Sequence, residues 1–146
     1  MKLWIPIAAL AVALSPLAVI HPVQVSGRSM EPGLHDGELV WALWAWCAGK
    51  PERGELWLVK VPEGVSVKRA IGLPGEQVEA RDGEIFINGS RLDESYVRWS
   101  DHLSGAWTCG DGYLVLGDNR TQSHDGRAWG PLPKTVLRSR VVVFTR

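Results

Sequence analysis

The chain has 146 residues, which is enough for one domain with a short appended segment. Its 16 basic residues balance its 16 acidic residues, so the charge gives no indication of a nucleic-acid or other polyanionic partner. The hydrophobic fraction of 45% is ordinary for a globular protein and excludes an intrinsically disordered chain.

The N-terminus carries a long apolar run. Residues 3–20 contain no charge and, as a helix, would reach about 27 Å, close to the thickness of a bilayer core. Lys2 precedes the run, and positive charge stays on the cytoplasmic side. We therefore expect residues 1–22 to be a single transmembrane anchor with a cytoplasmic N-terminus, and residues 23–146 to be an extracytoplasmic domain. The alternative is a cleaved signal peptide, but the apolar residues continue beyond the small-x-small pattern at 11–13.

After the anchor, short apolar runs alternate with turn residues, which is typical of β-strands. Asp82-Gly83 suits a type I′ turn, so the residues around it should form a hairpin. The strand candidates are residues 38–44, 55–61, 65–73, the two arms of the hairpin within 79–89, 112–118 and 140–145. About seven strands predict one all-β domain with Greek-key or barrel-like closure.

Tryptophan and cysteine leave two questions open. The chain has eight tryptophans, and strand alternation places Trp44 and Trp46 on one face with Trp41 on the other. They could form an apolar surface at the membrane interface, where Trp is favoured, or a core of large aromatic side chains. Cys47 and Cys109 form no CxxC motif, so a zinc site is not expected, while a disulfide between them stays possible.

Three separated segments carry candidate chemistry, and each alone has an ordinary interpretation as a loop, a strand face or a turn. They are "SGRSMEP" at residues 26–32, "VKRAIGLPGE" at 67–76 and "LGDNRTQSHDGRAWG" at 116–130. A nucleophilic serine in the first segment would need a base within about 3 Å of its hydroxyl and donors for the developing oxyanion.

Two kinds of base are available to such a serine. His124 is followed by Asp125, but neighbours in an extended segment point to opposite sides, so Asp125 could not easily orient the imidazole. Lys68 lies in a predicted strand, on the same face as Ser66 and Ala70. If that face is buried, desolvation lowers the pKa of Lys68 from about 10.4 towards the range useful to a base. If Lys68 extends to solvent instead, it stays charged, and this alternative remains open.

Taken together and in this order, the three segments resemble those of bacterial type I signal peptidases, which are membrane-anchored Ser/Lys endopeptidases. In that family a Ser-Met-x-Pro block, a Lys-Arg-x-x-Gly-x-Pro-Gly block and a Gly-Asp-Asn-Arg block with Ser-x-Asp-x-Arg follow an N-terminal anchor. Here the blocks read "SMEP", "KRAIGLPGE" and "GDNRTQSHDGRAWG". The match covers nearly all of residues 23–146.

The resemblance implies a role for each matching residue. Ser29 would be the nucleophile, Lys68 the general base, and Ser123 the residue that hydrogen-bonds and orients the lysine amine. The Ser29 N–H would form part of the oxyanion hole, and the nucleophile loop would further include Gly27, Met30 and Pro32. Gly27 stands where some members carry a serine that supplies a second oxyanion donor. The site would be braced by the pairs Arg69–Asp118 and Arg127–Asp125, together with Asn119 and Arg120.

The resemblance also implies the substrate and the partners. Exported preproteins would add as a strand beside the site, with small side chains before the cut in shallow pockets. The lipid bilayer would be the other partner, and neither a metal nor another cofactor is expected. Two alternatives stay open, namely a pilus-maturation peptidase of the same chemistry and an inactive, membrane-anchored peptide-binding module.

Overall fold

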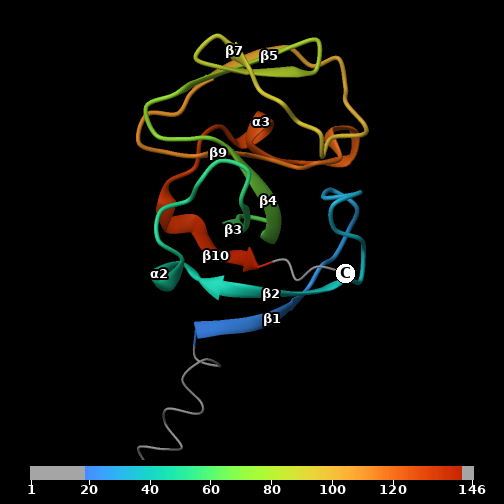
Figure 1. The fold of residues 1–146 in the computed structure, drawn as a ribbon, viewed down its shortest axis with the longest axis vertical. Helices are drawn as coiled ribbons and strands as arrows, with labels where there is room; N and C mark the ends of the chain where they lie inside the picture. Colours follow the sequence, from blue (N-terminus) through green and yellow to red (C-terminus); the bar gives the residue numbers. More distant parts are fainter. Residues whose placement is uncertain (1–18, 143–146) are drawn as a thin grey trace, which may run out of the picture.

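The computed structural model describes residues 19–142, which form two antiparallel sheets (Figure 1). The predicted anchor falls almost wholly outside the described residues. Within residues 19–142, no helix is long and apolar enough to cross a membrane. Strand β1 (Ile20–Gln24) begins inside the segment assigned to the anchor, so the folded domain takes in the last residues of that segment.

The larger sheet has six strands in the order β1-β2-β10-β3-β4-β9, and all neighbours are antiparallel. Besides β1, its strands are β2 (Leu39–Trp44), β10 (Leu137–Val142), β3 (Leu56–Val61), β4 (Gly64–Gly72) and β9 (Leu114–Leu116). This order places β4, which carries the second sequence block, beside β9, which leads into the third.

The smaller sheet has the order β7-β6-β5-β8 and lies at the upper end of the molecule in Figure 1. Its strands are β5 (Gln77–Arg81), β6 (Glu84–Ile87), β7 (Ser90–Arg91) and β8 (Gly105–Thr108). Asp82 and Gly83 join β5 to β6 with φ values of 50° and 84°. Two positive φ values are what a type I′ turn requires, so the predicted hairpin is confirmed.

The helices that lie wholly within residues 19–142 are all single turns. They are α2 (Ala45–Ala48), η1 (Arg120–Gln122), α3 (Gly126–Trp129) and η2 (Lys134–Val136). Asp125 caps α3, because its side chain accepts a hydrogen bond from the Arg127 N–H. A mostly β domain with few helical residues agrees with the predicted fold class.

The core explains why β3 begins with four successive apolar residues, Leu56 to Val59. Leu56 and Leu58 point into a cluster that also holds Met30 from the first sequence block. Trp57 and Val59, on the other face of β3, belong to a second cluster on the opposite side of the sheet. A strand buried on both faces needs apolar residues at successive positions rather than at alternate ones. A third cluster lies between β4, β9 and the smaller sheet.

The predicted count of about seven strands is too low, since ten strands are described. Three strands were missed: β1, because its sequence, IHPVQ, falls at the end of the apolar segment, and β7 and β8, because they have only two and four residues. Strands β1 and β9 are the outer strands of the larger sheet, and no described pairing joins them into a closed barrel.

Two local expectations also change. Strand β2 ends at Trp44, so Trp46 lies on α2 and does not share a strand face with Trp44. Trp57 is fully buried, whereas Trp46 is 73% exposed, so the tryptophan cluster divides between core and surface. Cys47 and Cys109 are free thiols, and no disulfide joins them.

Candidate active site

Ser29 lies on the loop between β1 and β2. Backbone hydrogen bonds close the base of this loop, from Val25 N to the Glu38 carbonyl and from Gly37 N to the Val25 carbonyl, both at 2.8 Å. Met30 is 1% exposed and packs into the first core cluster, and its carbonyl accepts from the Leu34 N–H at 2.9 Å. The Met30 side chain therefore anchors the loop next to Ser29, which fits the role in shaping the bend that the resemblance implies for Met30. The peptide bond between Glu31 and Pro32 is cis.

Lys68 and Ser29 are in direct contact, although 39 residues separate them in the chain. Lys68 Nζ lies 2.8 Å from Ser29 Oγ and donates a hydrogen bond to it. Only 3% of Lys68 is exposed, because β4 holds it between β3 on one side and the chain after β9 on the other. The alternative in which this lysine extends to solvent is therefore wrong.

Burial lowers the pKa of Lys68 below its ordinary value, and this is the largest effect on the amine. The charge of Arg127 lowers the pKa further, while the carboxylates of Asp125 and Asp118 raise it without cancelling the effect of burial. A lysine in this environment gives up its proton more readily than a lysine in water. A neutral amine at 2.8 Å can accept the proton of the serine hydroxyl.

Asn119 holds the nucleophile loop from behind. Its backbone N–H donates to the Ser29 carbonyl at 3.0 Å, and its side-chain amide donates to the Arg28 carbonyl at 3.2 Å. The Thr121 hydroxyl donates to the Asn119 Oδ1 at 2.9 Å and fixes the orientation of the amide. Because Asn119 is only 4% exposed, these bonds are shielded from water and hold the loop in one position.

Two charged pairs lie in the same region, Arg69 with Asp118 and Arg127 with Asp125, the pairs that the family resemblance implies. Arg69 and Asp118 form a bidentate pair, with Nε to Oδ1 at 2.8 Å and Nη2 to Oδ2 at 2.6 Å. Arg127 Nε donates to Asp125 Oδ1 at 2.8 Å, and Asp125 Oδ2 also accepts from the Gly117 N–H at 2.9 Å. These bonds lower the pKa of Asp125 even though burial alone would raise it.

Arg120 and Arg127 fix the chain after β9 by binding its carbonyl groups. Arg120 is 3% exposed, donates to the Gly117 carbonyl at 3.0 Å and pairs with Glu94. Arg127 donates to the carbonyls of Arg120 at 2.7 Å and Ser123 at 3.0 Å. The loop that faces Lys68 and Ser29 is thus held by buried guanidinium groups rather than by regular secondary structure.

Ser123 lies close to Ser29, but not in the predicted hydrogen bond. A Cβ placed on Gly117 would lie 2.2 Å from the Ser123 hydroxyl and 2.7 Å from the Ser29 carbonyl, so only glycine fits between the two serines. The Ser123 hydroxyl is buried and makes no hydrogen bond of ordinary geometry with a described residue, although it lies near enough to Asp125 to lower the pKa of that carboxyl. The expected bond from Ser123 to the Lys68 amine is therefore absent from this arrangement.

The oxyanion position has one evident donor. The Gly27 N–H donates to Asp36 Oδ1 at 2.8 Å and is therefore already in use. Gly27 itself has a φ of 89°, a conformation that favours glycine. The Ser29 N–H, by contrast, has no acceptor within residues 19–142, so it is available to a developing oxyanion next to the nucleophile.

The histidine alternative finds no support in this geometry. His124 packs edge-on against Trp129, with ring centroids 5.2 Å apart. Asp125 is occupied by Arg127 and by the Gly117 N–H, so it does not orient the imidazole. Among the described residues, the base in contact with the Ser29 hydroxyl is Lys68.

Comparison with known proteins agrees with this constellation. A family model described as "Signal peptidase, peptidase S26" matches residues 1–145. The chain belongs to the signal peptidase family. The family predicted from the three sequence blocks, a family of serine endopeptidases, is thereby confirmed.

Relatives of this signal peptidase occur in several bacteria. A probable signal peptidase I-2 of Synechocystis sp. is 34% identical over 134 residues, which cover 82% of this chain and 60% of that protein. Signal peptidase IB of Staphylococcus aureus is 30% identical over 145 residues, covering 84% of this chain and 76% of the relative. The chain thus spans less than two thirds of the length of the first relative.

A solved structure shares the fold. The crystal structure of a signal peptidase I from Enterococcus faecalis is 32% identical in sequence and superposes with a TM-score of 0.55. The match covers 65% of this chain and 98% of the crystallised one. The similarity therefore extends over nearly all of that catalytic structure.

A cavity of about 220 Å³ opens beside Ser29. Ser29 and Met30 line it from the nucleophile loop, and the remaining lining residues come from β1 and the residues after it, from β3 and from β4. They are Val23, Gln24, Val25, Ser26, Leu58, Val65, Ser66 and Val67. Most of these side chains are apolar, so the cavity favours small apolar groups.

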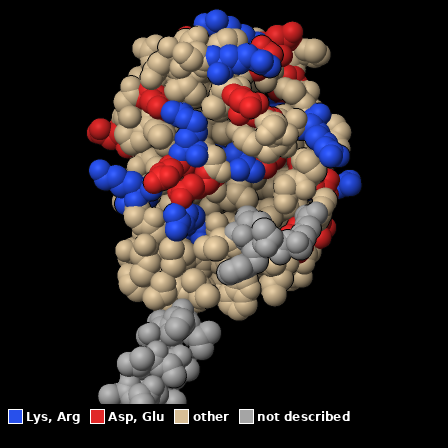
Figure 2. Space-filling view, viewed as in Figure 1, with Lys and Arg blue, Asp and Glu red and all other residues tan. Residues whose placement is uncertain are grey.

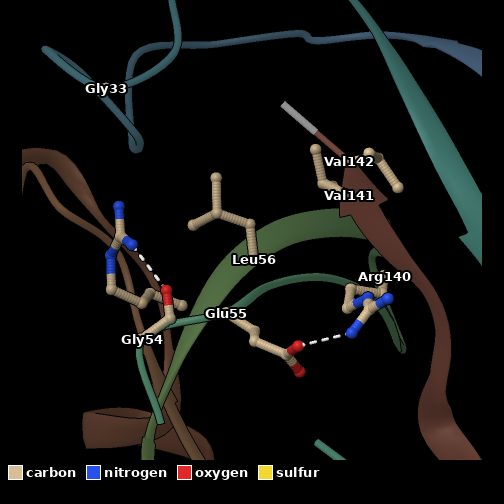
Figure 3. Close-up of a pocket in the computed structure, with 8 residues that line it drawn as sticks. Gly33, Gly54, Glu55, Leu56, Arg140, Val141 and Val142 are labelled. Atoms are coloured by element: carbon tan, nitrogen blue, oxygen red, sulfur yellow. Dashed lines mark hydrogen bonds and ion pairs between the residues drawn. The ribbon is translucent and has the colours of Figure 1, made fainter. Parts of the chain in front are cut away.

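A larger cavity of about 490 Å³ lies elsewhere, against Leu56, Val141 and the ion pair of Arg140 with Glu55 (Figure 3). Neither Ser29 nor Lys68 lines it, so it is not the place of bond cleavage. Arg69 also lines this cavity and donates to the Gly54 carbonyl at 2.6 Å. Because the same guanidinium pairs with Asp118, it connects the residues that line the cavity to that ion pair.

Two residues that shape the site, Gly117 and Asp36, could not be recognised from the sequence. Gly117 stands in the third block, but only the structure shows that it separates Ser123 from Ser29. Asp36 has no motif around it, and its contact with the Gly27 N–H depends on how the loop folds back between β1 and β2.

Proposed function

We propose that this signal peptidase removes N-terminal signal peptides from exported preproteins, with Ser29 as nucleophile and Lys68 as general base. The observation that carries the proposal is the 2.8 Å contact between a buried lysine of lowered pKa and a serine hydroxyl. The same contact favours an enzyme over an inactive peptide-binding module, because a binding module has no need of a buried amine.

The proposed reaction begins with transfer of the Ser29 proton to the neutral Lys68 amine. Oγ attacks the carbonyl carbon of the scissile bond, and the negative oxygen that forms accepts a hydrogen bond from the Ser29 N–H. The lysine then gives its proton to the leaving amine as the acyl-enzyme forms. In the second half, Lys68 takes a proton from water, which attacks the ester, and the ammonium then returns that proton to Ser29 Oγ as the ester C–O bond breaks, so that the serine hydroxyl and the neutral amine are both regenerated.

Ser123 is proposed to orient the lysine amine during these transfers. Its support is positional, since the Ser123 hydroxyl lies across Gly117 from Ser29 and makes no hydrogen bond of ordinary geometry with a described residue. A buried hydroxyl without a partner is unfavourable by roughly 1–3 kcal/mol, and a small rotation of the amine would satisfy it.

The preprotein is proposed to bind as an added β-strand. Strand β4 pairs with β9 only from Arg69 to Gly72, so its first half has a free edge on that side within the described residues. This edge faces the cavity whose other wall is the segment after β1, and the nucleophile lies at its end. A peptide between the two walls can form backbone hydrogen bonds while small side chains enter the cavity.

Cleavage of a purified preprotein, read by mass spectrometry of both products, tests this function. We expect one cut after a small-x-small sequence, and replacement of the small residue before the cut by a large one should abolish the cut. Cleavage that ignores the size of that residue would contradict the proposed specificity.

The membrane placement is part of the same proposal. Residues 1–22 would anchor the chain with a cytoplasmic N-terminus, and residues 23–146 would lie on the extracytoplasmic side. Protease added to cells with permeabilised outer layers should degrade the domain while the inner membrane stays sealed. Protection of the domain from the added protease under those conditions would contradict the proposed topology.

A further inference from the structure

The connection between β7 and β8, residues 92–104, reaches three arginines of the candidate site, Arg69, Arg120 and Arg127. Its contacting side chains are Tyr96, Glu94 and Asp101, which meet these arginines in that order. In Figure 1, α3, which carries Arg127, lies between the smaller sheet and β9. The connection lies outside the three sequence blocks, so it is a fourth segment at the border of the site.

Asp101 is the partner of one side of the Arg127 guanidinium. Nη1 donates to Asp101 Oδ2 at 2.6 Å, and no other described residue accepts a hydrogen bond from Nη1. The other two nitrogens bind the Asp125 carboxylate and the carbonyls of Arg120 and Ser123. The guanidinium therefore lies between two carboxylates: the Asp125 side chain is fully buried, and 37% of the Asp101 side chain is exposed.

The connection has other contacts that keep it in place. Its Trp99 carbonyl accepts from the Arg120 N–H at 3.0 Å. Its Ser100 hydroxyl and Leu103 carbonyl bind the backbone of Gly83, in the β5–β6 turn, at 3.1 and 3.0 Å. A carboxylate that is more than a third exposed gains little stability from an ion pair, because water screens the charges. The pair is therefore better explained by what Asp101 does for Arg127 than by what it does for the connection.

Arg127 and Asp125 also act on the Lys68 amine. Burial lowers the pKa of Lys68 most. Among its charged neighbours, Asp125 and Asp118 raise this pKa and Arg127 lowers it, while Arg69 is paired with Asp118. A guanidinium between two carboxylates presents less net positive charge to the amine than a guanidinium paired with one.

The other charges around this pair are mixed in sign. Figure 2 shows basic and acidic side chains interspersed over the upper and middle parts of the face in view. The titratable side chains that line the cavity of about 480 Å³ beside the pair are Asp101, Arg120, His124, Asp125 and Arg127. Because Arg120 is paired with Glu94, His124 is the group whose titration must be separated from that of Lys68.

We propose that Asp101 is a positioning residue for the reaction, which fixes the Arg127 guanidinium and the loop that this guanidinium binds. Through Arg127 it holds the Asp125 carboxylate and the Ser123 carbonyl in the arrangement that surrounds Lys68. Asp101 acts through Arg127 and not on the substrate, so it is not itself a catalytic residue. The inference rests on the proposed function, in which Lys68 is the general base.

The test is the pH dependence of peptide cleavage by the full-length Asp101→Asn chain in detergent. Without the Asp101 charge, Arg127 is less neutralised and disfavours the charged amine more strongly. The acid limb of kcat/KM, which reports the proton loss of Lys68, should therefore move to lower pH by about half a unit. On the plateau, kcat should fall about tenfold with KM nearly unchanged, because the guanidinium is held less firmly.

Three further chains make the test specific. Asp101→Glu keeps the charge and should restore both the acid limb and most of kcat. Asp93→Asn removes an exposed carboxylate from the same connection and should change neither. The comparison is repeated with His124→Gln in both chains, where the shift of the acid limb should persist. Urea unfolding checks each fold, and the smaller neutral variant Asp101→Ser replaces Asp101→Asn if that chain unfolds.

An unchanged acid limb in the neutral variant would overturn the proposal, whatever its kcat. A purely structural role alters the amount of active enzyme but not the pH at which Lys68 loses its proton. The same shift in Asp93→Asn, or loss of the shift with His124→Gln, would overturn the proposal as well. Failure of the proposed function is distinguishable, because the wild type would then not cleave the peptide or Lys68→Ala would cleave it normally, and this inference would fall with it.

Discussion

A single side chain, Lys68, combines two requirements that ordinarily conflict. To act as the proposed base near neutral pH, Lys68 must be buried, yet a buried ammonium is costly. Asp125 and Asp118 are near enough to raise its pKa, but each is already paired with an arginine. Their charges are thus largely neutralised, and burial determines the outcome.

This conflict predicts that Lys68→Met stabilises the protein while abolishing cleavage. Between the lowered pKa of folded Lys68 and its ordinary value of 10.5, the unfolded chain binds a proton that the folded chain does not, so wild-type stability rises with pH. The variant lacks this dependence. It should be more stable by about 1–2 kcal/mol at low and neutral pH, and the difference should shrink as the pH approaches 10.5.

Urea unfolding of both chains across this pH range measures the difference. The matched control is Lys60→Met on the neighbouring strand, where the lysine is exposed, and the control should show no comparable gain. If Lys68→Met is less stable than the wild type at every pH, the buried amine does not carry the cost assigned to it.

Asn119 is a second single residue with a testable role, because it donates hydrogen bonds to the backbone of the nucleophile loop. Asn119→Ala removes the amide bond to the Arg28 carbonyl but keeps the backbone bond to Ser29. We expect kcat to fall about tenfold with KM nearly unchanged, because the bond positions the nucleophile and does not touch substrate. Asn88→Gly in the β6–β7 turn should leave kcat unaltered, and a rise in KM alone for Asn119→Ala would refute the positioning role.

At the scale of elements, the site depends on three segments that approach from different parts of the chain. Strand β4 supplies Lys68, the loop between β1 and β2 supplies Ser29, and the chain after β9 supplies Asn119 and Ser123. Sequence alternation alone predicts β3, β4 and the β5–β6 hairpin well, because each has a clear apolar pattern. It does not predict which strands become neighbours, and that pairing places the three blocks together.

The cavity beside Ser29 leads to a prediction about β3, which lines it through Leu58. Leu58→Ala should enlarge the cavity and raise kcat/KM for substrates with a valine or leucine before the cut about tenfold, while lowering it for alanine. Val59→Ala removes a buried side chain from the opposite face of β3 and serves as the control. Val59→Ala should lower the stability of the protein without changing its preference for the residue before the cut. A wild-type preference in Leu58→Ala would contradict the proposed pocket.

At the scale of the whole molecule, the sequence allowed the all-β class and the residues of the site to be predicted, but not their geometry. The two serines and the lysine were assigned through resemblance, since Ser29 and Lys68 lie 39 positions apart and the sequence between them does not indicate that their side chains come within 2.8 Å. The role of Gly117 was invisible, because the need for glycine arises from two serines that only the fold brings together. Trp46 was placed on a strand because the alternation of β2 continues into α2 without a turn residue.

The most direct test of the central claim is the rate of preprotein cleavage by Ser29→Ala, Lys68→Ala and His124→Ala, each purified and checked for its fold. The Ser/Lys account predicts a loss of at least about a thousandfold in kcat for the first two variants and near wild-type cleavage for His124→Ala. Full activity of either Ser29→Ala or Lys68→Ala would contradict the account, as would loss in His124→Ala with Lys68→Ala unaffected.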